Sequence, residues 1–244
     1  IRDSYYGIYC YKSSCIVITN CTIGRNYLGV YCSYSSYITI VNCTFVHNGV
    51  FLYGAQFIHF ASHTIEDNIV NGKPLYYIVN ITGPYEVPSN AGEVIVVNST
   101  NIIINGANVS WADVGIEVAY SFDINIKNCM LDNENLVGVY CYSSYDIDIV
   151  SCTISHNGWH GVSCEDSSII TITDCIISQN GLGDIYGSDG IYCDFSSYIT
   201  IFNCTISHNG WEGIDCLDSS NITIMNCTIS HNWVHGISFY ELSS

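Results

Sequence analysis

One phrase, NCTISHN, recurs along the chain and restricts the fold more than any other feature. It begins at Asn203 and again at Asn226, a step of 23 residues, and close variants begin at Ser151 and Asn42. A unit repeated at a fixed period of this size is the signature of a solenoid, in which each repeat buries its apolar face only against its neighbours. The repeat therefore predicts one elongated domain for residues 1–244.

Each repeat contains three short runs of alternating apolar and polar residues, separated by polar corners. The repeats start at Gly7, Gly29, Gly115, Gly138, Gly161, Gly190, Gly213 and Gly236. Such alternation indicates β-strands, and the abundant Ile, Val, Thr and Tyr suit a pleated, half-buried surface. Three strands and three corners describe one coil of a single-stranded parallel β-helix. We predict an all-β solenoid of about nine to ten coils of 22–23 residues, stacked about 4.8 Å apart.

The rhythm changes in the middle of the chain. Residues 1–70 and 115–244 are predicted to form regular coils, whereas residues 71–114 are predicted to form enlarged coils with a protruding loop near residues 80–92. The step from Gly161 to Gly190 is 29 residues, which places an insertion at residues 182–189. Because the chain starts and stops within a repeat, we expect a piece of a longer chain or a protomer that stacks end to end.

Charge excludes nucleic acid as a partner. The net charge is −17, and the only positive side chains besides histidine are Arg2, Lys12, Arg25, Lys73 and Lys127. Scattered cations cannot form the positive surface that a phosphate backbone requires, and an anionic polysaccharide would be repelled unless cations bridged it. No apolar run is long enough to span a bilayer, and no signal peptide is recognisable. We expect a secreted, extracellular or cell-surface protein whose targeting segment has been removed.

Three stretches resemble a known family. They are the coil pattern GVYCxxSSxITIxNCTIS, the segment HTIEDNIVNGKPLYYIVN from His63, and AGEVIVVNSTNIIINGANVS from Ala91. Together they resemble the NosD-like branch of the right-handed parallel β-helix proteins, which is similar to carbohydrate-binding and sugar-hydrolysing β-helix domains. The resemblance spans essentially the whole chain and implies a right-handed coil and a periplasmic or cell-surface protein of archaeal type. Some relatives assist copper-site assembly.

All cysteines except Cys15 fall into two columns at inward positions. The columns are Cys10, Cys32, Cys141, Cys164, Cys193 and Cys216, and Cys21, Cys43, Cys129, Cys152, Cys175, Cys204 and Cys227. We expect buried thiols that fill the coil interior. Disulfides between neighbouring coils are the alternative, because stacked Cα atoms are close enough for a bridge. Metal clusters rank third, since no CxxC pair occurs. Cys15 lies at a corner and is the candidate free or intermolecular thiol.

Asparagine also forms two columns at the corners, exemplified by Asn203 and Asn209. Asparagine tolerates left-handed backbone conformations, and stacked amides can bond one another in a ladder, so these columns are interpreted as structural. Eight Asn-x-Ser/Thr sequons occur in the chain. A glycan needs an exposed loop, which makes Asn80, Asn98, Asn108 and Asn221 the glycosylation candidates.

Two weak metal sites are candidates. His208 and His231 occupy one corner column and are expected to stack, and imidazole suits copper or zinc. Asp166 and Asp218, with neighbouring Glu165 and Asp194, line another corner and could bind calcium. In both cases a solvated corner is the simpler interpretation, and no cofactor is predicted. No pair of carboxylates set for acid–base work is recognisable, so no catalytic residue is predicted.

Three functions follow, in order of preference. The first is a non-catalytic structural surface protein, such as an S-layer, filament or adhesin module, that associates with itself or with other surface proteins. The second is a carbohydrate-binding or polysaccharide-cleaving β-helix, with glycans as partners, because outward tyrosines such as Tyr31 and Tyr140 can grip sugar rings. The third is a copper-handling accessory protein, which the family resemblance alone implies.

Overall fold

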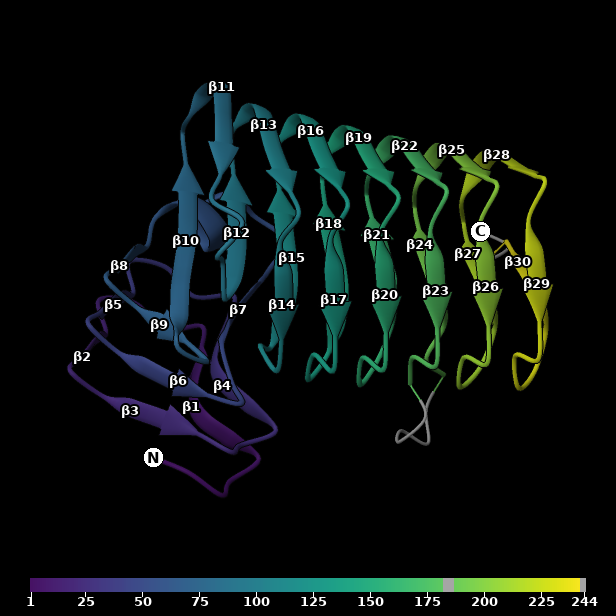
Figure 1. Ribbon diagram of the computed structural model, residues 1–244. Coiled ribbons are helices and arrows are strands. Elements are labelled where there is room, and N and C mark those ends of the chain that lie inside the picture. Colours follow the sequence, from purple (N-terminus) through teal and green to yellow (C-terminus); the bar gives the residue numbers. More distant parts are fainter. Residues whose placement is uncertain (182–186, 242–244) are drawn as a thin grey trace.

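The computed structural model describes residues 1–181 and 187–241, which form a parallel β-solenoid of about ten coils (Figure 1). This confirms the predicted all-β fold. Within the described residues the single helix is α1, Ile58–Ala61. No helix of this part of the chain is long and apolar enough to cross a membrane.

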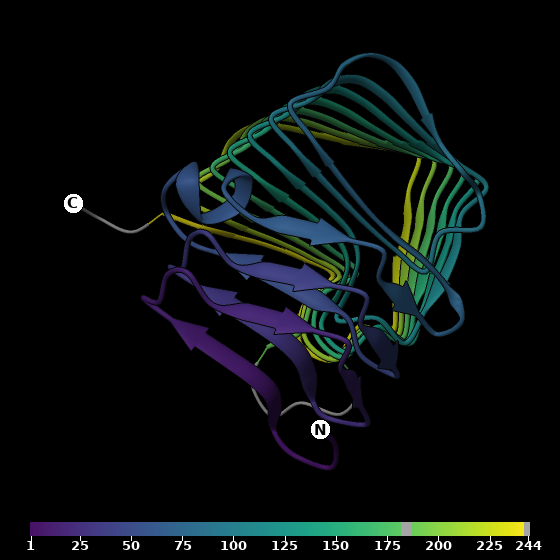
Figure 2. The same cartoon turned by 90° about the vertical axis from the view of Figure 1, so that its left-hand side faces the viewer.

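Two stacks of coils make up the molecule, and the first, at the N-terminus, contains nine strands. Its strands form three columns. These are β1 (Tyr6–Tyr11), β4 (Leu28–Ser33) and β7 (Val50–Tyr53); β2 (Val17–Thr19), β5 (Thr39–Val41) and β8 (Thr64–Glu66); and β3 (Thr22–Gly24), β6 (Thr44–Val46) and β9 (Ile69–Val70). In Figure 2 this N-terminal stack, drawn in purple and blue, is displaced to one side of the solenoid axis.

The second stack, the main solenoid, also has three columns of strands. The first column is β10 (Lys73–Val79), β12 (Glu93–Val97), β15 (Val114–Ala119), β18 (Val137–Tyr142), β21 (Val162–Glu165), β24 (Ile191–Asp194), β27 (Ile214–Leu217) and β30 (Ile237–Tyr240). The second is β11 (Thr82–Val87), β13 (Thr100–Asn105), β16 (Phe122–Lys127), β19 (Tyr145–Val150), β22 (Ser168–Thr173), β25 (Ser197–Phe202) and β28 (Ser220–Met225). The third is β14 (Asn108–Ser110), β17 (Met130–Asp132), β20 (Thr153–Ser155), β23 (Ile176–Ser178), β26 (Thr205–Ser207) and β29 (Thr228–Ser230).

The two stacks are joined by an antiparallel pair. Strand β9 pairs with β10 in antiparallel register, with Val70 opposite Lys73, whereas the other strand pairs of the described residues are parallel. The first column of the main solenoid therefore continues β3, β6 and β9 as one eleven-stranded sheet, and the other two N-terminal columns end at β7 and β8. The N-terminal stack is consequently turned relative to the main solenoid.

The protruding loop predicted near residues 80–92 contains a strand. Its residues Thr82–Val87 form β11, which pairs in parallel with β13. The physical reason is that backbone groups on the open edge of β13 need hydrogen-bond partners, which this segment supplies. The connection from β10 to β11 still rises above the neighbouring coils (Figure 1). The insertion predicted at residues 182–189 falls mainly on residues 182–186, which lie outside the described residues.

The N-terminal stack covers part of the outer face of the main solenoid. Strands β12, β15 and β18 are buried on both faces, whereas β24 and β27 alternate between buried and half-buried residues. Helix α1 contributes to the cover, because Phe60 is fully buried and its ring stacks on that of Tyr142 at 5.3 Å. A sheet that is covered on both sides needs apolar residues on both sides, as in EVIVV from Glu93.

Buried carboxylates connect the two stacks. Val50 N on the edge strand β7 donates to both carboxylate oxygens of Glu93, at 3.1 and 3.0 Å, and Leu52 N donates to Glu117 Oε2 at 3.3 Å. At the neighbouring corner, Gly29 N donates to Asp113 Oδ2 at 2.7 Å. Glu93 and Glu117 satisfy backbone donors of β7, which has no further strand beside it, and Asp113 satisfies a donor at the start of β4. Carboxylates thus replace the missing strand.

These junction carboxylates are fully enclosed and lie near one another. Glu93, Asp113, Glu117 and nearby Glu134 are at most 1% exposed. Burial raises the pKa of Asp113 to about 6 and raises the pKa of the three glutamates well above their usual value, with repulsion from Asp113 adding to the shift of Glu93. Desolvation disfavours a charged carboxylate, so these four groups keep their protons to a higher pH in the folded protein than in the unfolded chain.

The corners are organised by asparagine, as predicted. The buried Asn157, Asn180 and Asn209 and the half-buried Asn232 form an amide ladder, in which the side-chain amide of each of the first three donates to the next side-chain oxygen at 2.9–3.0 Å. The ladder also requires glycine at the start of each coil: a Cβ at Gly161 would lie 2.6 Å from Gly190 O and 2.8 Å from Asn180 Nδ2. The other asparagine column, which includes Asn203, is exposed and has φ near 55°.

The cysteines are free thiols, and their predicted columns are interrupted where the stacks meet. Cys10 and Cys32 belong to the column that ends at Leu52 in β7, whereas Cys141, Cys164, Cys193 and Cys216 continue a column that includes Val118 in β15. Eleven thiols are buried, Cys21 and Cys227 are half-buried, and Cys15 is exposed.

Alkylation of the native protein is therefore expected to modify Cys15 readily and Cys21 and Cys227 partially, while the eleven buried thiols stay protected. The thiolate is the reactive form, and burial raises the pKa of thiols such as Cys43. Intact-mass spectrometry before and after denaturation measures this. Rapid native labelling of all fourteen would contradict the buried columns, and protection that survives denaturation without reductant would reveal disulfides.

Candidate functional site

The candidate site lies where the N-terminal stack stops covering the eleven-stranded sheet. Two outward columns cross this boundary. They are Ile95, Glu117, Tyr140, Ser163, Tyr192 and Asp215, and Val97, Ala119, Tyr142, Glu165, Asp194 and Leu217. Along both columns the side chains change from fully buried to half-buried and largely polar. The same sheet is thus a packing face at one end and an accessible face at the other.

A hollow of about 250 Å³ opens at this boundary, and we name it the junction cleft. It is lined by Tyr31, Phe51, Tyr53, Val137, Tyr140, Trp159, Ser163 and Glu165. An adjoining hollow, also of about 250 Å³, shares Tyr31, Phe51 and Trp159 with it and extends along the N-terminal stack to Tyr5. Strands β4 and β7 supply one wall, and β18 and β21 supply the other.

Stacked aromatic rings form the wall on the N-terminal stack. The ring of Tyr31 lies between those of Tyr9 and Phe51, with centroids 5.4 and 5.3 Å apart and planes within 19° and 7°. Phe51 meets Tyr140 edge to face, at 5.6 Å and 79°. Parallel coils place equivalent rings next to one another, and these geometries are favourable for aromatic pairs. The cleft therefore has a rigid aromatic wall.

Glu165 is the titratable group at the floor of the cleft. The Tyr140 hydroxyl donates to its Oε2 at 3.2 Å, and the Ser163 hydroxyl lies 3.5 Å from its Oε1. Burial raises the pKa of Glu165 to about 7, with further repulsion from Asp194 and Asp166 and an opposing effect of the Tyr140 hydroxyl. A carboxyl with this pKa exchanges its proton near neutral pH, as a general acid or base must.

A row of carboxylates continues from Glu165 along the uncovered face. Asp194 is its partner on the next coil, and Asp215 follows one coil further in the adjacent column. Burial raises the pKa of both aspartates, and Asp194 Oδ1 and Asp215 Oδ1 are buried without a hydrogen-bond partner. The three ion pairs of residues 1–181 and 187–241 all involve histidine and none involves this row.

A second aromatic group lies at the corner beside this row. His160 is buried, and its ring stacks on Tyr192 at 4.8 Å and lies tilted by 34° against Trp159 at 4.4 Å. His160 Nδ1 lies 3.4 Å from Asp189 Oδ2, and Trp159 Nε1 donates to Gly187 O at 3.1 Å. These contacts hold the Trp159 ring at the rim of the cleft while leaving 37% of the residue exposed.

The histidine pair predicted from the sequence is close in space but faces solvent. The rings of His208 and His231 are 4.8 Å apart and within 3° of parallel. Both residues have a φ near 57°, a left-handed corner conformation in which histidine is enriched. Parallel rings direct their ring nitrogens side by side instead of toward one point. With Trp233 they line an open hollow of about 350 Å³.

The structure does not bring the two weak calcium candidates together. Asp166 and Asp218 occupy equivalent corners two coils apart, and Phe195 occupies the corner between them. Two coil steps separate backbones by about 9–10 Å, which is too far for the two carboxylates to share an ion at normal calcium distances without side-chain rearrangement. Within the described residues, no group of three or more His, Cys, Asp or Glu side chains is arranged to hold a metal ion.

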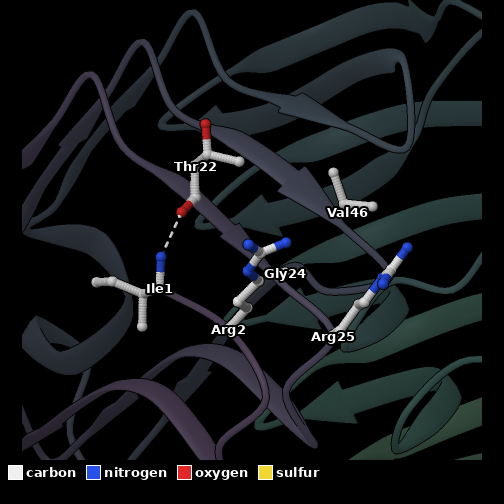
Figure 3. A pocket seen from close by; sticks show the side chains of 6 residues that line it. All are labelled: Ile1, Arg2, Thr22, Gly24, Arg25 and Val46. Atoms are coloured by element: carbon white, nitrogen blue, oxygen red, sulfur yellow. Dashed lines mark hydrogen bonds between the residues drawn. The ribbon is translucent and has the colours of Figure 1, made fainter.

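A further hollow, of about 320 Å³, lies at the first coil (Figure 3). Arg2 and Arg25 line it, and the amino group of Ile1 donates to Thr22 O at 2.8 Å. Its lining contains neither an aromatic ring nor a carboxylate. It is therefore chemically distinct from the junction cleft.

The four glycosylation candidates are exposed. Asn80, Asn98, Asn108 and Asn221 all face solvent. Asn98 Nδ2 donates to Asn80 Oδ1 at 2.6 Å, so these two amides bond each other. The sequence alone does not distinguish these sites from Asn42, which is equally exposed and bonded to Asn20. Modification of these sites stays a prediction.

The fold and the cleft define a class: a single-stranded β-solenoid with an open site on the outer face of its longest sheet. The family model described as the right-handed β-helix region matches residues 1–85, 78–188 and 114–244. The chain belongs to this family, which confirms the right-handed parallel β-helix expected from the sequence. No curated protein sequence matches the chain significantly.

Solved structures show the same architecture at low sequence identity. A variant of the periplasmic alginate epimerase AlgG is 14% identical, with a TM-score of 0.51, and the match covers 94% of this chain and 61% of that one. Tailspike protein 2 of the Escherichia coli O157:H7 bacteriophage CAB120 is 11% identical, with a TM-score of 0.49, over 93% of this chain and 33% of that one. The Streptococcus pneumoniae surface protein and adhesin PfbA is 16% identical, with a TM-score of 0.39, over 86% and 68%. The chain thus spans about a third to two thirds of their lengths, and the likeness to the epimerase establishes the fold alone.

Proposed function

We propose that this β-helix binds a carbohydrate chain in the junction cleft. The observation that carries the proposal is the arrangement of the Tyr31, Phe51 and Tyr53 rings opposite Tyr140, over a floor that presents Ser163 and Glu165. Ligand sites combine apolar and aromatic walls with a few placed polar groups. Ring faces suit the apolar faces of sugars, and the polar floor suits sugar hydroxyls.

The open geometry favours a polymer over a small molecule. Two adjoining hollows share Trp159, and the outward positions of the next two coils carry the half-buried Asp194 and Asp215, so the accessible face extends over several coils. The proposal gives preference to the carbohydrate-binding function over the structural surface protein, because the latter does not account for the cleft. Glu165 is the residue through which binding would extend to acid–base chemistry.

Replacing Trp159 with alanine is expected to weaken glycan binding at least about tenfold, the loss of about 1.4 kcal/mol of contact energy. Trp159 borders both hollows, and its half-exposed ring can be removed without opening the core. A glycan array identifies the ligand, and calorimetry with that ligand measures the loss. The matched control is Trp233→Ala, because Trp233 is 74% exposed and lines the histidine hollow, which shares no residue with the junction cleft. Equal binding by both variants would contradict the location.

A further inference from the structure

We infer that the hollow at the first coil binds one tetrahedral oxyanion, a sulfate or phosphate group, between the side chains of Arg2 and Arg25. This site shares no lining residue with the junction cleft, so it goes beyond the proposed function and does not depend on it. Figure 3 shows both guanidinium groups at the edge of the same hollow, which measures about 320 Å³.

The period of the coils brings these two side chains together. Arg2 and Arg25 are the only arginines of the chain and are 23 positions apart, close to one coil. Arg2 forms a parallel bridge with Gly24, so the two arginines lie on successive coils, diagonally across this bridge. In a chain with a net charge of −17, two of the five lysine and arginine side chains therefore line one hollow.

The two positive charges have no counter-charge in the hollow. No carboxylate lines it, and among residues 1–181 and 187–241 neither guanidinium group has an ion-pair or hydrogen-bond partner. Asp3 is adjacent in sequence, but only its backbone N contacts this region, donating to Arg25 O at 3.2 Å. A guanidinium offers five donors and no acceptor. Two like charges beside one hollow repel each other, and a bound anion relieves that repulsion.

A missing side chain makes room for the ion. Arg2, Gly24 and Val46 follow one another in one column on three coils, and Gly24 leaves a gap between its two neighbours. A Cβ at Gly24 would lie 2.8 Å from Val46 O. The amino group of Ile1 already donates to Thr22 O, so the two guanidinium groups are the donors that hold the ion.

Two arginines suit a tetrahedral oxyanion better than a carboxylate. One guanidinium fork binds two oxygens of an anion through parallel hydrogen bonds. A carboxylate has only two oxygens, which a single fork can occupy, whereas a sulfate or phosphate group has enough oxygens to meet both forks. A single group is expected and not a polyanion, because charges beyond about 8 Å are screened at physiological ionic strength and the rest of the molecule is strongly negative.

The arginine Nε–H signals in nuclear magnetic resonance spectra report this binding directly, because the chain has only two of them. During titration with sodium sulfate or phosphate at constant ionic strength, both signals are expected to shift with one shared dissociation constant. Acetate is expected to bind at least about tenfold more weakly. Glucose 6-sulfate and glucose 6-phosphate, compared with glucose, show whether the group is accepted as part of a sugar or only as a free ion.

Four variants test the assignment. Arg2→Gln and Arg25→Gln are each expected to weaken sulfate binding at least about tenfold, measured on the arginine that remains. Lys12→Gln is the matched control, because it removes a positive charge of the first coil that does not line the hollow, and it should bind as the parent does. Asp3→Asn should tighten binding, since it removes a nearby negative charge. Unchanged backbone amide spectra show that each variant is folded.

Three results would overturn the inference. The first is the absence of a saturable shift with sulfate and phosphate, or different dissociation constants at the two arginines. The second is equal affinity for acetate and sulfate. The third is equal weakening by Lys12→Gln, which would indicate diffuse charge instead of a site. Failure of the proposed function is a separate outcome, because Trp159→Ala should leave the sulfate titration unchanged.

Discussion

Replacing Glu117 with glutamine is expected to raise the melting temperature by several degrees near pH 8 and to leave it nearly unchanged near pH 5. Glu117 is fully buried, and burial raises its pKa well above the usual value. In the unfolded chain the group ionises near its ordinary pKa of 4.5. The folded state keeps the proton to a higher pH. The contribution of protonated Glu117 to the free energy of unfolding is therefore complete below the unfolded pKa and is lost as pH rises through the folded pKa.

Glutamine preserves the contacts of the neutral acid. Its side-chain oxygen can accept from Leu52 N, as Glu117 Oε2 does, and its amide takes the place of Oε1, which has no partner in the structure. What it removes is the cost of a buried charge, about 1.4 kcal/mol for each unit by which the pKa is raised. For a domain of this size, each kcal/mol shifts the melting temperature by about 2–4 °C.

Thermal unfolding followed by circular dichroism at the two pH values measures the effect. Glu93, Asp113, Glu134 and the hydroxyls of Tyr77 and Tyr140 share the electrostatic environment of the junction, so part of the pH dependence persists in the single variant. The double variant Glu93→Gln/Glu117→Gln should reduce the pH dependence of the melting temperature further. The control is Glu66→Gln, on the exposed face of β8. The same pH dependence in the junction variant and the parent would refute the prediction.

Replacing Asn180 with alanine is expected to lower the free energy of unfolding by about 3–5 kcal/mol. Asn180 is fully buried; its Oδ1 accepts from the backbone and side-chain nitrogens of Asn157, and its Nδ2 donates to Ile154 O and Asn209 Oδ1. Alanine removes four hydrogen bonds, and Asn157 N is left buried without its acceptor. An unpaired buried group costs more than the bond itself contributes.

Chemical denaturation of the variant measures this loss, and Asn203→Ala is the matched control. Asn203 belongs to the exposed asparagine column, where water replaces the lost bond to Asp174. An alanine held at the φ of 55° that Asn203 adopts is strained by about 1 kcal/mol. The control variant is therefore expected to lose about that much free energy of unfolding. Similar losses in the two variants would mean that the buried ladder contributes no more than an ordinary corner.

Most of the local structure can be predicted from the repeat. Glycine at the start of each coil, inward cysteines and asparagine corners all follow from one column-by-column reading, because neighbouring coils present equivalent residues to one another. The same reading places His208 beside His231. It also aligns Asp166 with Asp218, but Phe195 occupies the corner between them, so these two side chains lie two coils apart. The proposed site could not be predicted this way.

The junction cleft depends on contacts that the repeat does not encode. Tyr53 and Tyr140 line one hollow although 87 positions separate them in the chain. One signal was available: EVIVV from Glu93 and VGIEVA from Val114 are apolar on both faces, which indicates a second layer over the sheet. The sequence does not show that the layer is the N-terminal stack, and the glutamates within these runs conceal the signal.

The order in which the molecule folds follows from the carboxylate junction. Neighbouring coils join residues about 22 positions apart, whereas Leu52 and Glu117 are 65 apart and Gly29 and Asp113 are 84 apart. Closing a longer loop costs more chain entropy, and distant contacts slow folding. The coils of each stack can therefore assemble by local growth, and docking of the N-terminal stack comes last. Until then β7 is an open strand edge, the part of the nascent protein most exposed to pairing with another chain.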